Sequence, residues 1–179
     1  AAGLYSQTPA LEKILSQTGN PHLKNIKATH FVWGVGQALD NGWSWHTDLF
    51  YKDLSDLVVS VPDDSVDANL DVNYSNQAEG VAYGVELLIN KALTEKWDGW
   101  AALSLGKAER TDLRRNETHP FDYDRPIKFD LVANYSLNDK WVLGFKWIYQ
   151  TGDRYTAIVD VAQNPNHASV LEPIYGRRN

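Results

Sequence analysis

The protein has 179 residues, a length that fits a single domain. Its formal net charge of −6 argues against a nucleic-acid partner, which would need a basic surface, and the absence of Cys excludes disulfides and thiolate metal sites. Aromatic residues make up 12% of the sequence, yet the mean hydropathy is −0.43. No run approaches the roughly 18 apolar residues that a membrane helix needs. A β-barrel wall remains possible, because it needs apolar residues only at alternate positions.

Residues 1–26 predict a loop that contains one short helix. Thr8 has the character of an N-cap, Pro9 suits the first helical position and Gly19 is a stop signal. The strand-like alternation of apolar and polar residues begins only after this segment, at Lys27.

Three β-hairpins are predicted after Lys27, at residues 27–59, 77–112 and 125–152. Their short turns follow one pattern, a Leu, three polar or turn-forming residues and then Trp, at 39–43, 93–97 and 137–141. Each alternating run is about 10–12 residues long, close to the ~9–11 residues that a tilted transmembrane strand needs.

Long polar segments alternate with these short turns. They comprise residues 60–78, 111–125 and 151–179. Short turns at one end and long loops at the other are typical of an outer-membrane β-barrel, with the short turns on the periplasmic side. We therefore predict one partial barrel domain over residues 1–179, in which 1–26 and 153–179 are extracellular loops.

Aromatic and charged residues favour the same fold. Trp43, Trp97 and Trp141 directly follow the short turns and are predicted to form an interfacial aromatic girdle. Charges in the middle of the runs lie on the face without the aromatic residues, because a charge facing lipid costs roughly 2–4 kcal/mol. The polar residues predicted to face the lumen are His46, Asp48, Glu86, Lys128, Asp130 and Lys146. Lys128, Asp130 and Lys146 could pair with one another or contact a plug inside the barrel, and pairing is favoured.

Several segments resemble the barrel of TonB-dependent outer-membrane receptors. They are residues 3–9, 19–24, 30–34, 48–54, 84–88, 107–110, 120–126 and 149–156, which follow one another in order along nearly the whole chain. The resemblance implies a barrel of about 22 strands around a folded plug. About six strands of its later part would lie here, so we expect a fragment, or the ordered part, of a longer protein. The plug and the energy-coupling segment are not found in these residues.

The resemblance also implies a function. Members take up a scarce nutrient, such as a ferric siderophore, cobalamin, a sugar or a peptide, across the outer membrane of a Gram-negative bacterium. The implied partners are outer-membrane lipid, the small-molecule ligand, the rest of the barrel, the plug and the TonB complex. Two alternatives remain: a passive porin-like channel, and a soluble β-sheet module that binds a ligand, since a soluble antiparallel sheet shows the same alternation.

Candidate ligand contacts lie at the end of the fifth predicted run. Arg110, Arg114 and Arg115 could meet an anionic ligand at the lumen mouth, or else be solvated or pair with Glu109 and Asp112. The acidic cluster at 63–71 lacks the order of a calcium loop, and the stretch 119–124 (His-Pro-Phe-Asp-Tyr-Asp) is predicted to be structural. No catalytic motif is found, and we predict no metal site and no cofactor.

Overall fold

A computed structural model describes residues 1–16, 19–61, 73–152, 156–164 and 167–178. The elements in chain order are β1 (Ala2–Gln7), α1 (Leu11–Leu15), β2 (Ile26–Ala38), the 3-10 turn η1 (Asp40–Gly42), β3 (Trp43–Ser60), β4 (Tyr74–Thr94), β5 (Trp97–Asp112), β6 (Glu117–Pro120), β7 (Ile127–Asn138), β8 (Trp141–Gln150), β9 (Thr156–Asn164) and β10 (His167–Arg178).

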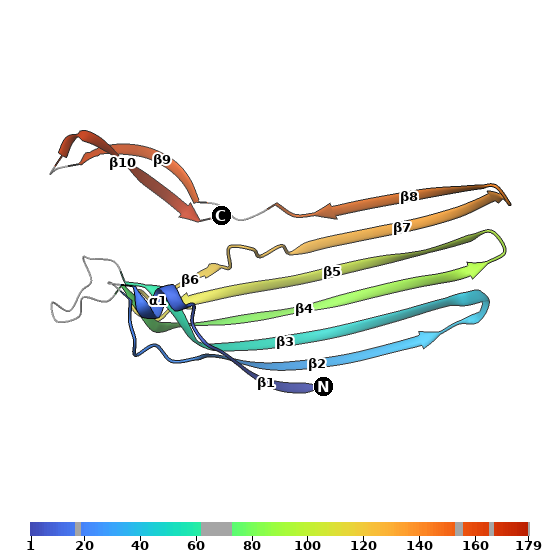
Figure 1. The fold of residues 1–179 in the computed structure, drawn as a ribbon, viewed down its shortest axis with the longest axis horizontal. Helices are drawn as coiled ribbons and strands as arrows, with labels where there is room; N and C mark the ends of the chain where they lie inside the picture. Colours follow the sequence, from blue (N-terminus) through green and yellow to red (C-terminus); the bar gives the residue numbers. More distant parts are fainter. Residues whose placement is uncertain (17–18, 62–72, 153–155, 165–166, 179) are drawn as a thin grey trace.

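One antiparallel sheet dominates the structure (Figure 1). Its order is β1-β2-β3-β4-β5-β7-β8, with β6 paired to β5, and the sheet is open. The described part of β9 and β10 forms a separate two-stranded sheet. This architecture confirms the predicted all-β, antiparallel fold built from three consecutive hairpins, β2–β3, β4–β5 and β7–β8. No helix in the described residues is long and apolar enough to span a membrane.

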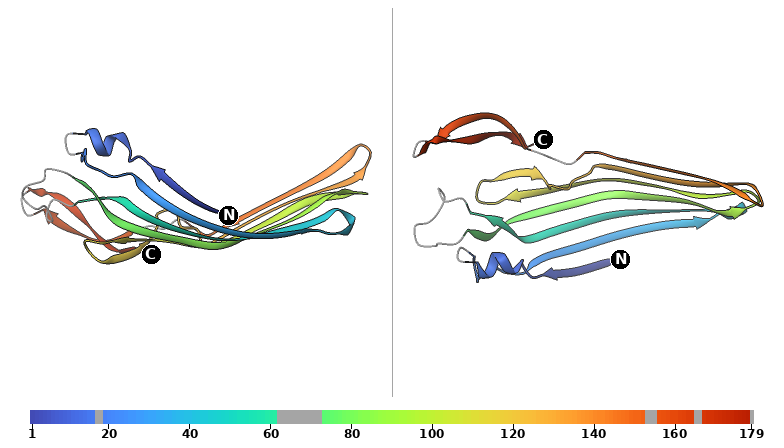
Figure 2. Two further views of the ribbon diagram at one scale, coloured as in Figure 1. Left: turned by 90° about the horizontal axis from the view of Figure 1, so that it is seen from below. Right: turned by 45° about the horizontal axis from the view of Figure 1, so that its top comes forward.

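The three short turns gather at one end of the sheet, which we call the turn end; α1 and β6 lie at the opposite end, the loop end (Figures 1 and 2). Local chemistry explains the turns. Asn41 and Gly42 have φ of 58° and 75°, a left-handed conformation that these two residues adopt at low cost. At the third turn, the Asn138 side chain accepts hydrogen bonds from the amides of Lys140 (3.0 Å) and Trp141 (3.1 Å).

The predicted boundaries were wrong at the loop end. Strand β3 has 18 residues and β4 has 21, because residues 74–78, predicted as loop, pair with 57–60 of β3. Strands β1, β6, β9 and β10 also form where the sequence predicted loops. For β1 the reason is tertiary: residues 2–7 add to the exposed edge of β2, opposite Ile26–Phe31, and the edge supplies the hydrogen bonds that the segment lacks alone.

The helix is also shorter than predicted. It begins at Leu11 with Ala10 in the N-cap position and no side-chain cap, so Thr8 does not cap it. It ends when Ser16 turns to an extended conformation, before Gly19.

A small core at the loop end joins the long strands. Leu57, Val59 and Ala78 are buried there, with Leu54 and Phe121 among the residues that pack against them. The rest of the described sheet is a single layer whose two faces are both open. What covers those faces therefore decides the function of the protein.

Candidate functional site

Strand pairing separates the side chains of the large sheet into two faces. In register across four strands, Trp33 lies opposite Leu49, Leu49 opposite Val85, and Val85 opposite Leu105. We call this side the apolar face; its other large members include Phe31, Tyr51, Tyr83, Leu87, Ile89, Leu103, Phe129, Leu131, Tyr135, Leu143, Phe145, Trp147 and Tyr149. The neighbouring positions form the polar face.

At the turn end the apolar face carries a Trp–Lys–Trp cluster. The rings of Trp43 and Trp97 meet edge to face with centroids 5.3 Å apart. Lys91 is opposite Trp43 and only 4% exposed, and its ammonium lies 5.2 Å from the centre of the Trp97 ring. That ammonium donates hydrogen bonds to the Ala92 carbonyl (2.8 Å) and to the Thr94 hydroxyl, so the charge points toward the turn.

Only part of the predicted girdle is in contact. Trp43 and Trp97 form a pair, whereas Trp141, on β8 at the sheet edge, is 66% exposed. Lys91 was not predicted from the sequence to belong to this cluster. Its position in the sequence could have indicated this role, because it lies two residues before the Leu of the second short turn. A long lysine side chain there can place its charge at an interface.

A second row of polar-tipped residues lies toward the loop end of the apolar face. Tyr51 is opposite Tyr83, Tyr83 is opposite Lys107, and the Lys107 ammonium lies 2.8 Å from the Glu109 carboxylate. Eight residues separate Trp43 from Tyr51, which at ~3.4 Å per residue is about 27 Å along the strand. With a tilt near 40° the height is about 21 Å, close to the ~25 Å apolar band of an outer-membrane barrel.

The polar face holds an open hollow of about 390 Å³ in the middle of the sheet. In register, Asp48 lies opposite Glu86, Glu86 opposite Ser104, and Ser104 opposite Lys128. The hollow is lined by these residues together with His46, Leu87, Leu88, Ala102, Leu103 and Asp130. The structure therefore brings five of the six predicted lumen-facing residues into one site.

Two ion pairs order this hollow. His46 Nε2 lies 2.9 Å from an Asp48 oxygen, and Lys128 Nζ lies 3.3 Å from an Asp130 oxygen. The second contact confirms the predicted pairing of Lys128 with Asp130. Lys146 lies opposite Val132 on the same face and makes no ion pair within the described residues.

Glycines on β2 make room for the His46–Asp48 pair. Gly34 is opposite Asp48 and Gly36 is opposite His46. A Cβ at Gly34 would overlap the Asp48 carboxylate, and one at Gly36 would lie 2.7 Å from His46 Nδ1 and 2.8 Å from the Trp45 carbonyl. Both side chains can therefore lie across the neighbouring strand.

The carboxylates of the hollow outnumber its cations. Lys128 is already engaged by Asp130, whereas Glu86 is exposed, faces Asp48 across the strand pair and makes no ion pair within the described part of the chain. Two like charges directly opposite each other destabilise a sheet unless something compensates. The arrangement can therefore bind a cationic group.

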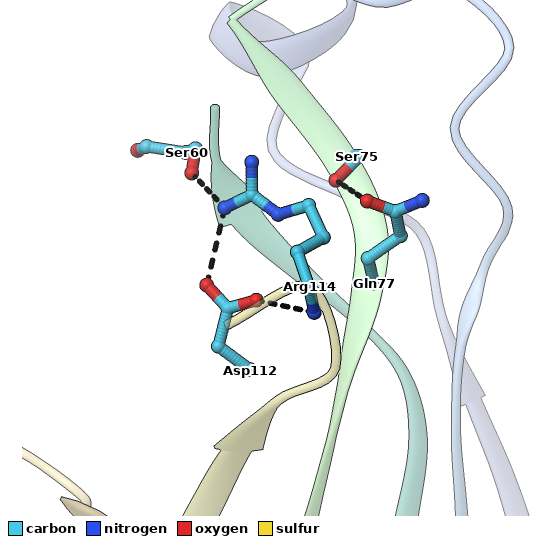
Figure 3. Close-up of polar contacts among 5 residues, drawn as sticks. All are labelled: Ser60, Ser75, Gln77, Asp112 and Arg114. Atoms are coloured by element: carbon cyan, nitrogen blue, oxygen red, sulfur yellow. Dashed lines mark hydrogen bonds and ion pairs between the residues drawn. The ribbon is translucent and has the colours of Figure 1, made fainter. Parts of the chain in front are cut away.

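The three candidate arginines are not one site. Arg114 is held within the protein: its guanidinium donates hydrogen bonds to the Asp112 carboxylate (3.1 Å) and to the Ser60 carbonyl at the end of β3 (2.8 Å), and its amide donates to Asp112 (2.9 Å), as Figure 3 shows. This fits the alternative of pairing with Asp112, while Glu109 pairs with Lys107 instead. Arg115 is exposed, and Arg110 is half-buried opposite Gly80.

The Asp112–Arg114 pair, which we call the clamp, is largely buried. Burial alone would raise the pKa of Asp112, but the hydrogen bonds and the charge of Arg114 outweigh it, so the pKa lies below its ordinary value of 3.8. The clamp joins the end of β5 to the end of β3 across β4, which makes Arg114 a structural residue.

The other acidic segments offer no site that the structure assembles. Residues 63–71 lie outside the described residues. In the stretch 119–124, Asp124 is buried and accepts the Ala108 amide (2.9 Å), which ties the segment to β5. Within the described residues, no group of three or more His, Asp or Glu side chains is placed to hold a metal ion.

Comparison with known proteins decides the family. The family model described as "TonB dependent receptor-like, beta-barrel" matches residues 3–171. The chain belongs to this family. No curated protein matches it. The family is one of outer-membrane transport receptors, and membership implies a membrane context and a transported ligand.

Proposed function

We propose that the chain forms part of the wall of an outer-membrane receptor that imports a scarce nutrient, with energy supplied through the TonB complex. The separation of the two faces, on a chain of this family, carries the proposal. One face offers a continuous apolar band of membrane height with Trp and Tyr at its ends, and the other offers charged groups around a hollow. This division suits a wall between lipid and a polar lumen.

In this proposal the apolar face contacts lipid. The turn end, with Trp43, Lys91 and Trp97, lies at the periplasmic interface of a Gram-negative outer membrane, and the loop end faces the medium. Aromatic rings and snorkelling lysines suit the boundary between hydrocarbon and water. The long strands β3, β4 and β5 then extend beyond the membrane, where the clamp and the small core hold their ends together.

The polar face contacts the plug in the same proposal. A plug surface that covers the hollow would remove water from Asp48 and Glu86, which is costly unless a cation meets them. We therefore expect a basic plug side chain beside Glu86. A passive channel would leave these carboxylates in water, so the plugged receptor and the porin-like alternative differ at this residue.

Uptake in cells tests the function. A strain that lacks the gene would be compared with one that carries it, using labelled ferric chelates, cobalamin, oligosaccharides and peptides, with and without a protonophore. We expect one of these ligands to enter only when the gene is present and the proton gradient is intact. Gene-dependent uptake that the protonophore leaves unchanged would support the passive channel and overturn the proposal.

Labelling tests the orientation of the sheet. Single cysteines at Leu87 and Leu88, neighbours on opposite faces, would be probed in the full receptor with a lipid-soluble and a water-soluble thiol reagent. We expect Leu87→Cys to react with the lipid-soluble reagent only. The reverse pattern would show that the apolar face does not meet lipid.

A further inference from the structure

The charge of the polar hollow depends on one histidine. The residues that line the hollow carry three carboxylates, from Asp48, Glu86 and Asp130, and one ammonium, from Lys128. These groups leave a formal charge of −2 when His46 is neutral and −1 when it is protonated. Histidine is the residue type whose ordinary charge change falls between about pH 5 and 8, so protonation of His46 halves the net charge of the hollow in that range.

His46 lies beside the two carboxylates that face each other across β3 and β4. Its Nε2 is 2.9 Å from an Asp48 oxygen, and Asp48 is directly opposite Glu86. The positions opposite His46 itself are Gly36 on β2 and Leu88 on β4, and neither is ionisable. The charged groups that face the ring are therefore Asp48 from its own strand and Glu86 from β4, whereas β2 contributes none.

The other two charged residues of the hollow already compensate each other. Lys128 and Asp130 lie on β7, which is separated from β3 by β4 and β5, and their charged atoms are 3.3 Å apart. Lys128 is therefore engaged by Asp130. Among the described residues that line the hollow, His46 is the one that remains to supply a positive charge to Asp48 and Glu86.

Strand β2 leaves space for the histidine ring. A Cβ at Gly36 would lie 2.7 Å from His46 Nδ1, and one at Gly34 would lie 3.3 Å from its Nε2, so only glycine at these positions gives the ring its full room. The His46 side chain is also 52% exposed, on the open side of the hollow. The ring can therefore gain or lose a proton from the lumen while the strands stay as they are.

A proton on His46 and a cationic group bound at Glu86 compete with each other. Both offset the same two carboxylates, Asp48 and Glu86, which repel each other when nothing compensates them. When His46 is neutral, the compensating charge comes from the bound group. When His46 is protonated, part of the compensation is already present and the bound group also meets a like charge, so it is held more weakly.

We propose that His46 makes the affinity of the polar hollow for a cationic group depend on pH. In the receptor that group is the basic plug side chain expected beside Glu86, so this inference rests on the proposed function. Above the range in which histidine titrates, the wall holds the plug side chain through Asp48 and Glu86. Below that range the protonated ring takes its place, and the contact between plug and wall weakens. The wall thus carries a proton-dependent control of the plug.

Release of the plug in urea, followed by a fluorine label on the plug of the full receptor, tests the inference. We expect the equilibrium constant for release to rise about three- to fivefold from about pH 7.5 to about pH 5.5 in the wild type. His46→Gln keeps a donor for Asp48 but cannot become charged, and it should remove this rise. Glu86→Gln should release the plug as readily at the higher pH as the wild type does in acid. His30→Gln, which removes a polar-face histidine opposite Lys52, is the matched control and should keep the rise.

Each remaining outcome counts against the inference. The same rise in the wild type and in His46→Gln would show that another group carries the pH dependence, and no rise in the wild type would show that there is none. Unchanged release in Glu86→Gln would show that the hollow holds no cation of the plug. The uptake assay separates the two proposals. Energised uptake by a receptor whose plug release ignores His46 overturns the pH control alone, whereas uptake that the protonophore leaves unchanged overturns the proposed function.

Discussion

The two faces of the sheet are made by the same strands, yet they are organised by different interactions. On the apolar face, large side chains lie next to one another in register, and Trp43 and Trp97 meet in an edge-to-face pair. On the polar face, residues are placed by specific partners: His46 by Asp48, Lys128 by Asp130, with space left by Gly34 and Gly36. The apolar face is therefore suited to a uniform apolar surrounding, whereas the polar face is suited to particular partner residues.

The largest expected effect comes from placing a charge on each face in turn. Leu87→Arg would put a guanidinium in the apolar band and should lower the free energy of unfolding by about 2–4 kcal/mol. Leu88→Arg, one residue along β4, lies on the polar face opposite His46 and Ala102 and should stay within about 0.5 kcal/mol. Urea unfolding of the barrel without its plug, in lipid, measures both, and equal losses would show that the two faces do not differ in this way.

The next effect concerns the loop end, where polar groups are buried rather than exposed. Arg114→Met leaves the buried Asp112 carboxylate without its guanidinium and should cost about 1–3 kcal/mol in local stability. Arg115→Met, the exposed neighbour, should change little. Hydrogen exchange of the amides at the ends of β3 and β5 measures the difference, and equal exchange in both variants would contradict the structural role of the clamp.

Acid should release the same clamp. Because the folded-state pKa of Asp112 is lowered, its stabilisation is complete above the ordinary value of 3.8 and is lost as the pH falls from there through the folded-state pKa. Amides at the end of β5 should therefore exchange faster in that acid range. Asp112→Asn should exchange fast already at neutral pH and lose this pH dependence; an unchanged dependence would point to another group.

A smaller effect separates the tryptophans of the apolar face. Trp97→Leu removes the contact with Trp43 and the ring beneath the Lys91 ammonium, so it should cost about 0.5–1.5 kcal/mol more than Trp141→Leu. Thermal unfolding in lipid compares the two. A larger loss at Trp141 would mean that membrane contact at the edge strand outweighs packing between the rings.

The smallest effect is expected on the polar face. The Lys128 side chain is about half exposed, so its pair with Asp130 is screened by water, and Lys128→Met should change stability by about 0–1 kcal/mol. The same unfolding measurement applies. That range applies to the barrel without its plug, and a loss well above it in the receptor with its plug would show that the plug covers the hollow, as proposed.

Prediction from the sequence was more accurate for the first hairpin than for the loop end of the strands. Period-two alternation with the Asn41-Gly42 signal predicted the first hairpin and the side of each residue, because both depend on neighbours in the chain. The length of β4 was missed because residues 74–78 look polar alone, and they pair only because Leu57, Val59 and Ala78 form a core with Phe121. Arg114 looked like a ligand residue, since the Ser60 carbonyl that it binds lies 54 positions away in the chain.

The fold class, the three hairpins, the two faces and the resemblance to TonB-dependent receptors could all be predicted from the amino-acid sequence. Each of these rests on local spacing, which a chain carries before it folds. The folded sheet was needed to see which distant residues meet. Lys91 lies against Trp97, the clamp holds Arg114, and one hollow is lined by His46, Asp48, Glu86, Lys128 and Asp130. Contacts between strands depend on register and on side-chain reach across the sheet, and these are settled when the strands pair.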